Sequence, residues 1–159
     1  MVKKIFSVLP LLVFFLSCDE KKELPEDWIA ININLENQRI SLINKTDSLY
    51  FKKWDYKDTI ENNSRVRKAV DFERENGIVT KEEKNKIFKL VYTLITDPIT
   101  PKNICTDYVG SLRLTIEYSE QMSQSSSYSS ICEWSTLSPE TQELQKLFEQ
   151  KLKSYSSDE

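Results

Sequence analysis

The sequence contains no histidine. Without an imidazole the chain cannot build a Ser-His-Asp or Cys-His catalytic arrangement, or a zinc site that uses histidine. Glycine is nearly absent as well, because Gly77 and Gly110 are the only two, and a glycine-rich phosphate-binding loop needs more than these. We therefore expect a protein that is not an enzyme and that holds no cofactor and no metal.

Basic segments are also missing. The chain carries 22 basic and 25 acidic residues, and neither an arginine-rich run nor a basic stripe is visible along it. Such a mildly acidic chain is typical of a soluble domain and is a poor match to nucleic acid. We expect no nucleic-acid partner.

One apolar run stands at the start of the chain. It follows Lys3 and Lys4, covers Ile5 to Leu16 and contains Pro10. About twelve apolar residues suit the central region of a secretory signal, whereas a membrane-spanning helix needs about twenty. The run therefore predicts export rather than a membrane span.

The four residues Phe15-Leu16-Ser17-Cys18 close this run. They resemble the lipobox of bacterial lipoproteins, although Phe15 stands where leucine is usual. The resemblance implies that residues 1–17 are a cleaved signal peptide and that Cys18, as first residue of the mature chain, carries diacylglyceryl and palmitate. The alternative is an ordinary cleaved signal followed by a coincidental cysteine.

Residues 18–26 are charged and end at Pro25-Glu26, so they predict a flexible tether. Removing Lys3 and Lys4 leaves 20 basic against 25 acidic residues, a formal charge of −5 on the mature chain. Acidic residues behind the cysteine loosely resemble the surface-export signals of Bacteroidota lipoproteins, while Asp19 alone resembles an inner-membrane retention signal of enterobacteria. We expect a lipid anchor in the cell envelope, at the outer membrane. The sequence does not decide whether the domain lies on the periplasmic side or on the cell surface.

Residues 27–155 predict a single domain and residues 156–159 a disordered tail. Alternating apolar residues predict strands over 28–35, 39–43, 48–54, 66–74, 111–118 and 128–134. Residues 55–64 are polar and predict an irregular segment, and Asn76-Gly77 predicts the end of the fourth strand. The order ββββαββα favours an α+β fold, in which one antiparallel sheet of about six strands packs two helices on one face.

Two helices are expected. Thr80 and Glu83 form a capping-box pattern before an apolar stripe that includes Ile87, Val91 and Ile95, with Lys84, Lys86 and Lys89 facing water. Ser138-Pro139 predicts the start of the second helix, whose core face comprises Leu144, Leu147, Phe148, Leu152 and Tyr155.

Two further cysteines, Cys105 and Cys132, remain after Cys18. In an exported protein such a pair predicts a disulfide, worth about 3 to 4 kcal/mol in the chain-entropy model. A hairpin centred near residues 122–123 would hold the sulfurs far apart. Either the chain folds back around Gly110, which we favour because Ser123–Ser127 is a poor strand sequence, or the turn is tighter and centred near Tyr118. Two free buried thiols are the remaining alternative.

Candidate functional residues are few. Tyr50, Trp54 and Tyr56 form an aromatic cluster that suits contact with a protein partner or stacking on a sugar, although such residues more often pack in a core or at its rim. Asp71 and Glu73 are spaced like residues of one strand face, as a carboxylate-dependent glycosidase would need, but surrounding charges favour a solvated surface.

No motif defines a reaction or a ligand. We expect a non-catalytic, monomeric, lipid-anchored envelope protein that binds a protein partner, for example as an immunity or inhibitor protein. A carbohydrate-binding protein or carboxylate-dependent cell-wall enzyme, and a purely structural envelope lipoprotein, are the alternatives.

Overall fold

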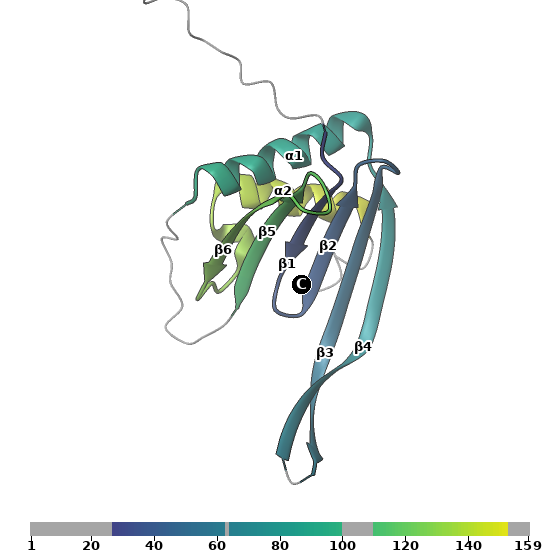
Figure 1. Cartoon of the computed structure of the whole chain (residues 1–159), viewed down its shortest axis with the longest axis vertical. Coiled ribbons are helices and arrows are strands. Elements are labelled where there is room, and N and C mark those ends of the chain that lie inside the picture. Colours follow the sequence, from purple (N-terminus) through teal and green to yellow (C-terminus); the bar gives the residue numbers. More distant parts are fainter. Residues whose placement is uncertain (1–26, 63, 100–109, 153–159) are drawn as a thin grey trace, which may run out of the picture.

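The computed structural model describes residues 27–62, 64–99 and 110–152. The predicted signal peptide, tether, Cys18, Cys105, Tyr155 and the tail lie outside these residues. Within them the predicted α+β fold is confirmed, because one antiparallel sheet packs both helices on one face (Figure 1).

Six strands form the sheet, in the spatial order β4-β3-β2-β1-β5-β6. Along the chain they are β1 (Ala30–Asn34), β2 (Gln38–Ile43), β3 (Ser48–Glu61), β4 (Ser64–Ile78), β5 (Ser111–Glu117) and β6 (Ser123–Ser129). The helices are α1 (Lys81–Thr96) and α2 (Pro139–Lys151), with a short 3-10 turn, η3 (Trp134–Thr136), before α2.

The core lies between the helices and one face of the sheet. Cross-strand pairs such as Ile31 with Leu42 and with Ile116 place apolar side chains on that face, where each is at most 1% exposed. Ile87, Phe88, Val91 and Leu94 of α1 and Leu144 and Phe148 of α2 cover them. The opposite, open face of the sheet carries mostly polar side chains.

Both helix starts are as the sequence predicts. Thr80 Oγ1 accepts a hydrogen bond from the Glu83 amide at 3.2 Å, and the Thr80 amide donates to Glu83 Oε2 at 2.9 Å. Ser138 caps α2 in the same reciprocal way, with Thr141 as its partner. These bonds satisfy backbone groups that a helix end otherwise leaves unpaired.

The prediction for residues 55–64 was wrong. They are not irregular, because β3 runs to Glu61 and β4 starts at Ser64, so the two strands project beyond the rest of the sheet (Figure 1). We call residues 54–72 the arm. No described residue from Lys52 to Ile78 is buried. Cross-strand pairing and polar contacts therefore hold the arm, which is why hydrophobic alternation did not reveal it.

Asn76-Gly77 does not end β4, which was also predicted wrongly. Gly77 pairs with Leu49 inside the strand, and a Cβ atom placed there would lie 2.9 Å from the carbonyl oxygen of Lys151. The glycine therefore permits the close approach of the C-terminus of α2, rather than a turn.

The return strand was placed too late. It is Ser123–Ser129, not residues 128–134, and the hairpin turn lies between Ser119 and Met122. This turn falls between the two predicted positions, and the serine-rich segment that we judged a poor strand pairs with β5 along its length. As an edge strand it buries only Tyr128, so it needs little apolar character.

Two smaller expectations were also wrong. Lys84 does not simply face water, since its side chain is 14% exposed and contacts Asp47. Ile29 lies within the predicted strand 28–35, but it precedes β1, which begins at Ala30, and is 47% exposed.

Candidate functional site

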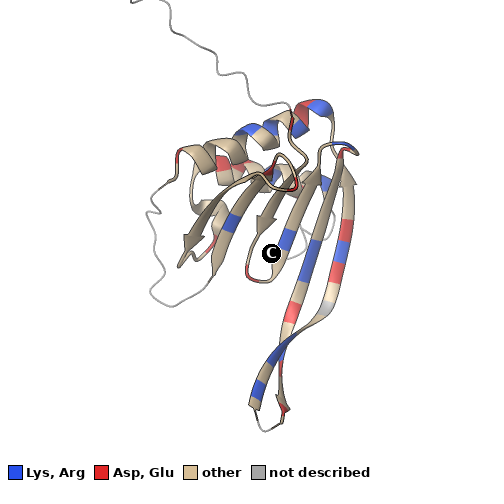
Figure 2. Ribbon diagram, in the orientation of Figure 1, with Lys and Arg blue, Asp and Glu red and all other residues tan. Residues whose placement is uncertain are grey.

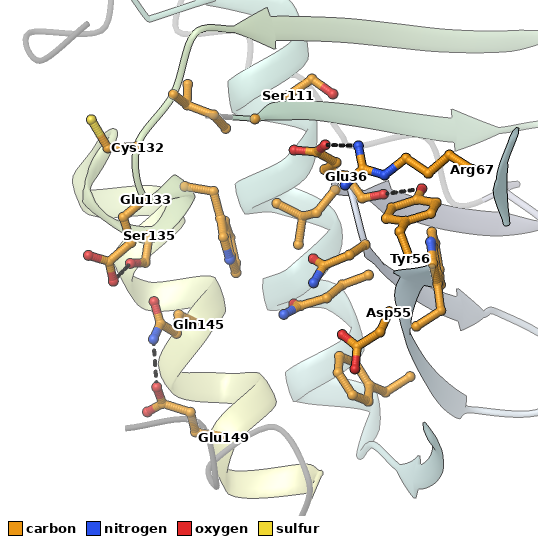
Figure 3. Close-up of a pocket in the computed structure, with 18 residues that line it drawn as sticks. Glu36, Asp55, Tyr56, Arg67, Ser111, Cys132, Glu133, Ser135, Gln145 and Glu149 are labelled. Carbon is orange, nitrogen blue, oxygen red and sulfur yellow. Dashed lines mark hydrogen bonds and ion pairs between the residues drawn. The ribbon is translucent and has the colours of Figure 1, made fainter. Parts of the chain in front are cut away.

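A groove of about 910 Å³ opens at the end of the sheet where the arm begins. One wall is formed by the β1–β2 turn and the base of the arm, and the other by residues 131–135 and α2 (Figure 3). Trp134, which is 8% exposed, and Phe51, which is 2% exposed, contribute buried aromatic surface between the walls.

The arm wall carries two of the three predicted aromatic residues. Trp54 and Tyr56 line the groove, and the Trp54 amide donates to the Asn37 carbonyl at 3.0 Å, which joins the arm to the β1–β2 turn. Tyr50 lies apart from the groove, at a position in β3 opposite Ser41 where its side chain is 43% exposed.

Tyr56 is held from two sides. Its hydroxyl donates to the Glu36 carbonyl at 3.0 Å, and the guanidinium of Arg67 lies 4.4 Å from the ring centroid. Arg67 also reaches Glu36 Oε1 at 3.9 Å. These contacts fix the ring at the mouth of the groove, although it remains 37% exposed (Figure 3).

The opposite wall carries carboxylates in defined positions. Glu133 Oε1 accepts a hydrogen bond from Ser135 Oγ at 2.8 Å, and Glu149 Oε1 accepts one from Gln145 Nε2 at 2.8 Å. Counting Glu36 and Asp55, the described residues that line the groove include four carboxylates and one cation, the guanidinium of Arg67. The groove is therefore acidic and partly aromatic.

Sequence reasoning missed most of this site. Glu36, Asp55, Arg67, Glu133 and Glu149 come from four separate segments and share no spacing. Only the aromatic pair, two residues apart in one strand, gave a local signal.

The other candidate carboxylates lie elsewhere. Between Lys53 and Asp55 the β3–β4 register shifts, so Asp71 falls at a β-bulge where regular strand alternation does not hold. Glu73 is exposed, pairs in register with Lys53 and does not line the groove. The described residues contain no group of three metal-ligating side chains.

Cys132 lines the groove next to Glu133. It lies three residues beyond Ser129, which pairs with Ser111 at the end of the hairpin. Since Cys105 lies outside the described residues, the disulfide between Cys105 and Cys132 stays a prediction.

Among the described helices, none is long and apolar enough to cross a membrane. Comparison of the chain with protein-family models, with curated proteins and with solved structures found no match.

Proposed function

We propose that the chain is a lipid-anchored, non-catalytic protein of the cell envelope that binds a protein partner through the groove. The anchor rests on the lipobox-like sequence ending at Cys18. The binding role rests on one observation, the presentation of Trp54 and Tyr56 on the wall of an open groove with four carboxylates.

The charge of the groove supports a basic partner. Arg67, the one cation among the described lining residues, already contacts Glu36 and the ring of Tyr56. The remaining acidic groups therefore favour a positively charged ligand. A segment with lysine or arginine side chains fits this charge, and such cations also stack on aromatic rings. An immunity or inhibitor protein that covers a basic surface of a toxin or hydrolase is one concrete form.

Site-specific photo-crosslinking tests this proposal. A photoreactive phenylalanine analogue replaces Tyr56, and the control replaces Met122, which is also exposed at 58% but lies in the β5–β6 turn. Crosslinking in the intact envelope should join the chain to one protein from position 56 and not from position 122. Equal products from both positions, or none from position 56, would contradict the proposal.

The charge of the groove is tested separately. The double variant Glu133→Gln and Glu149→Gln should weaken capture of the crosslinked partner by about tenfold, as expected for loss of two charge contacts, one exposed and one partly buried. Glu82→Gln with Glu120→Gln removes the same charge from exposed positions outside the groove. This control should bind like the unmodified chain.

A carbohydrate ligand is the second candidate, because aromatic rings and carboxylates lining one groove also suit a sugar. Binding of envelope glycans that is lost on Tyr56→Ala would favour it. Cleavage of those glycans that is lost on Glu133→Gln or Glu149→Gln would favour an enzyme instead. A chain with neither a protein partner nor a glycan ligand would be a structural envelope lipoprotein.

A further inference from the structure

The open face of the sheet carries a row of basic residues that the linear sequence does not show. Arg74 pairs with Lys52, Lys52 with Arg39, Arg39 with Asn34, and Asn34 with Arg113. Directly paired residues point to the same side of a sheet, so these side chains form one line. Figure 2 shows the corresponding basic bands side by side across β4, β3, β2 and β5.

The row crosses five neighbouring strands of the sheet. From β4 to β5 there are four strand-to-strand steps, which span about 19 Å at the usual strand spacing. Arg39, Arg74 and Arg113 are exposed, and Lys52 is partly exposed. Four cations on such a line form a surface rather than a single binding pocket.

No ion pair within the described part of the chain neutralises these charges. Among the described residues no carboxylate forms an ion pair with any of the four cations. Glu117, the acidic residue two rows away on this face, instead accepts a hydrogen bond from Asn32 at 2.7 Å. Asn32 also accepts from Arg39 at 3.0 Å, which positions the guanidinium.

Like charges placed directly opposite one another destabilise a sheet. Arg39, Lys52 and Arg74 occupy three adjacent strands in this unfavourable arrangement. Repulsion between these cations lowers the stability of the sheet, and no described carboxylate offsets it. Such a local cost to stability indicates a functional surface. An anion outside the protein would supply the compensation.

Exposed apolar residues accompany the row. Lys52 Nζ lies 4.3 Å from the ring centroid of Phe72, which places Phe72 beside the cations, and Phe72 is 50% exposed. Tyr50 and Ile78, paired with Asn76 and Ser48 on the same face, are 43% and 77% exposed. Basic side chains mixed with aromatic and aliphatic ones are typical of surfaces that rest on a bilayer.

We propose that the open face docks on a membrane surface rich in anionic phospholipid. This inference rests on the proposed lipid anchor, because a tether holds the domain beside a bilayer and weak electrostatic contacts then suffice to orient it. Among the described residues, neither the groove beside the arm nor the smaller one around Ser135–Pro139 is lined by any of the four cations. A planar array of phosphates complements the open face better than a narrow ligand does.

Vesicle binding of the unlipidated chain tests the inference. The chain from residue 19 onward contains every described element and lacks Cys18. We expect it to sediment with vesicles of phosphatidylcholine containing about one third phosphatidylglycerol, and not with pure phosphatidylcholine. Raising the salt concentration from about 0.1 M to about 1 M should abolish the binding.

Matched variants assign the effect to the row. Arg74→Gln with Arg113→Gln should reduce partitioning about 25-fold, from about fivefold for each cation removed. The control, Lys89→Gln with Lys146→Gln, removes two exposed cations from the helices. This control should reduce partitioning onto the vesicles far less. Because Arg74 and Arg113 are exposed, thermal unfolding should show both double variants folded.

Three results would overturn the inference. They are equal binding to both vesicle types, equal losses for the two double variants, and binding to a soluble polyanion such as dextran sulfate with none to vesicles, which would assign the row to an acidic macromolecule. Failure of the proposed groove function gives a different pattern. In that case crosslinking from position 56 fails, while vesicle binding and its dependence on Arg74 and Arg113 are unaffected.

Discussion

At the scale of single residues, Gly77 is a position where the fold leaves no room for a side chain. Its missing Cβ allows the backbone of Lys151 to approach β4. Gly77→Ala should lower the free energy of unfolding by about 1 to 3 kcal/mol, because backbone rather than a flexible side chain must move. Chemical denaturation measures this. Gly110→Ala is the control, since its nearest described neighbour would be at an ordinary 3.6 Å, and an equal loss there would refute the explanation.

Glu83 makes stability depend on pH. The hydrogen bond from the Thr80 backbone, together with Lys151 at 2.9 Å, holds the pKa of Glu83 below its ordinary value of 4.5, although partial burial opposes this. Because the folded pKa is lowered, the stabilisation is present above about pH 4.5 and is lost as the pH falls through the folded pKa.

Glu83→Gln should therefore destabilise the protein near neutral pH, and the difference from the unmodified chain should shrink as the pH falls below 4.5. Denaturation curves measured across this range check the effect. Glu82→Gln is the control because Glu82 is exposed in the same first turn and does not close the capping box. A difference for Glu83→Gln that stays constant with pH would contradict the assignment.

At the scale of elements, the arm is separable from the core. β3 contributes Leu49 and Phe51 to the core, and the next described buried residue along the chain is Val79. Replacing residues 56–69 by Asn-Gly would join Asp55 and Val70, which already pair in register, through a two-residue hairpin turn.

This shortened chain should unfold within a few degrees of the original melting temperature, since about 1 kcal/mol shifts it only about 2 to 4 °C in a domain near this size. It should also lose capture of the partner, because Tyr56 and Arg67 are removed from the groove. Thermal unfolding and capture of the crosslinked partner are measured on the same samples. A collapse in stability would show that the arm supports the core.

Elements with a buried face could be predicted from the sequence, and elements without one could not. β5 and both helices have one buried face, and β1 alternates isoleucine with smaller or polar residues, so apolar spacing located all four. The capping residues Thr80 and Ser138 fixed the helix starts. The arm and β6 bury almost nothing. Their strands depend on backbone pairing with a neighbour, which composition and periodicity do not report.

For the candidate site, too, only the local pattern could be read from the sequence. Trp54 and Tyr56 were recognisable because they are large and stand two residues apart in one strand. Glu133, before η3, and Glu149, in α2, reach the groove only through the packing of these segments. The basic row is a product of strand register, because Arg39, Lys52, Arg74 and Arg113 become neighbours only after five strands pair. Long-range assembly thus created both surfaces.

At the scale of the whole molecule, acidic and basic side chains gather on different surfaces. In the described part of the chain, the groove between the arm and α2 is lined by four carboxylates and one cation, while the row on the open face is basic. With a lipid at Cys18, the proposed docking would turn the basic face toward the bilayer and leave the groove accessible to a partner. This arrangement depends on the anchor more than on any other feature.

The most direct test of the account is therefore the mass of the N-terminal peptide of the chain isolated from membranes of its host. We predict that the peptide begins at Cys18 and carries a diacylglyceryl group, and that Cys18→Ala releases the chain from the membrane fraction. Globomycin should cause an unprocessed precursor to accumulate. A membrane-bound chain that begins elsewhere, or that keeps its membrane association after Cys18→Ala, would contradict the account.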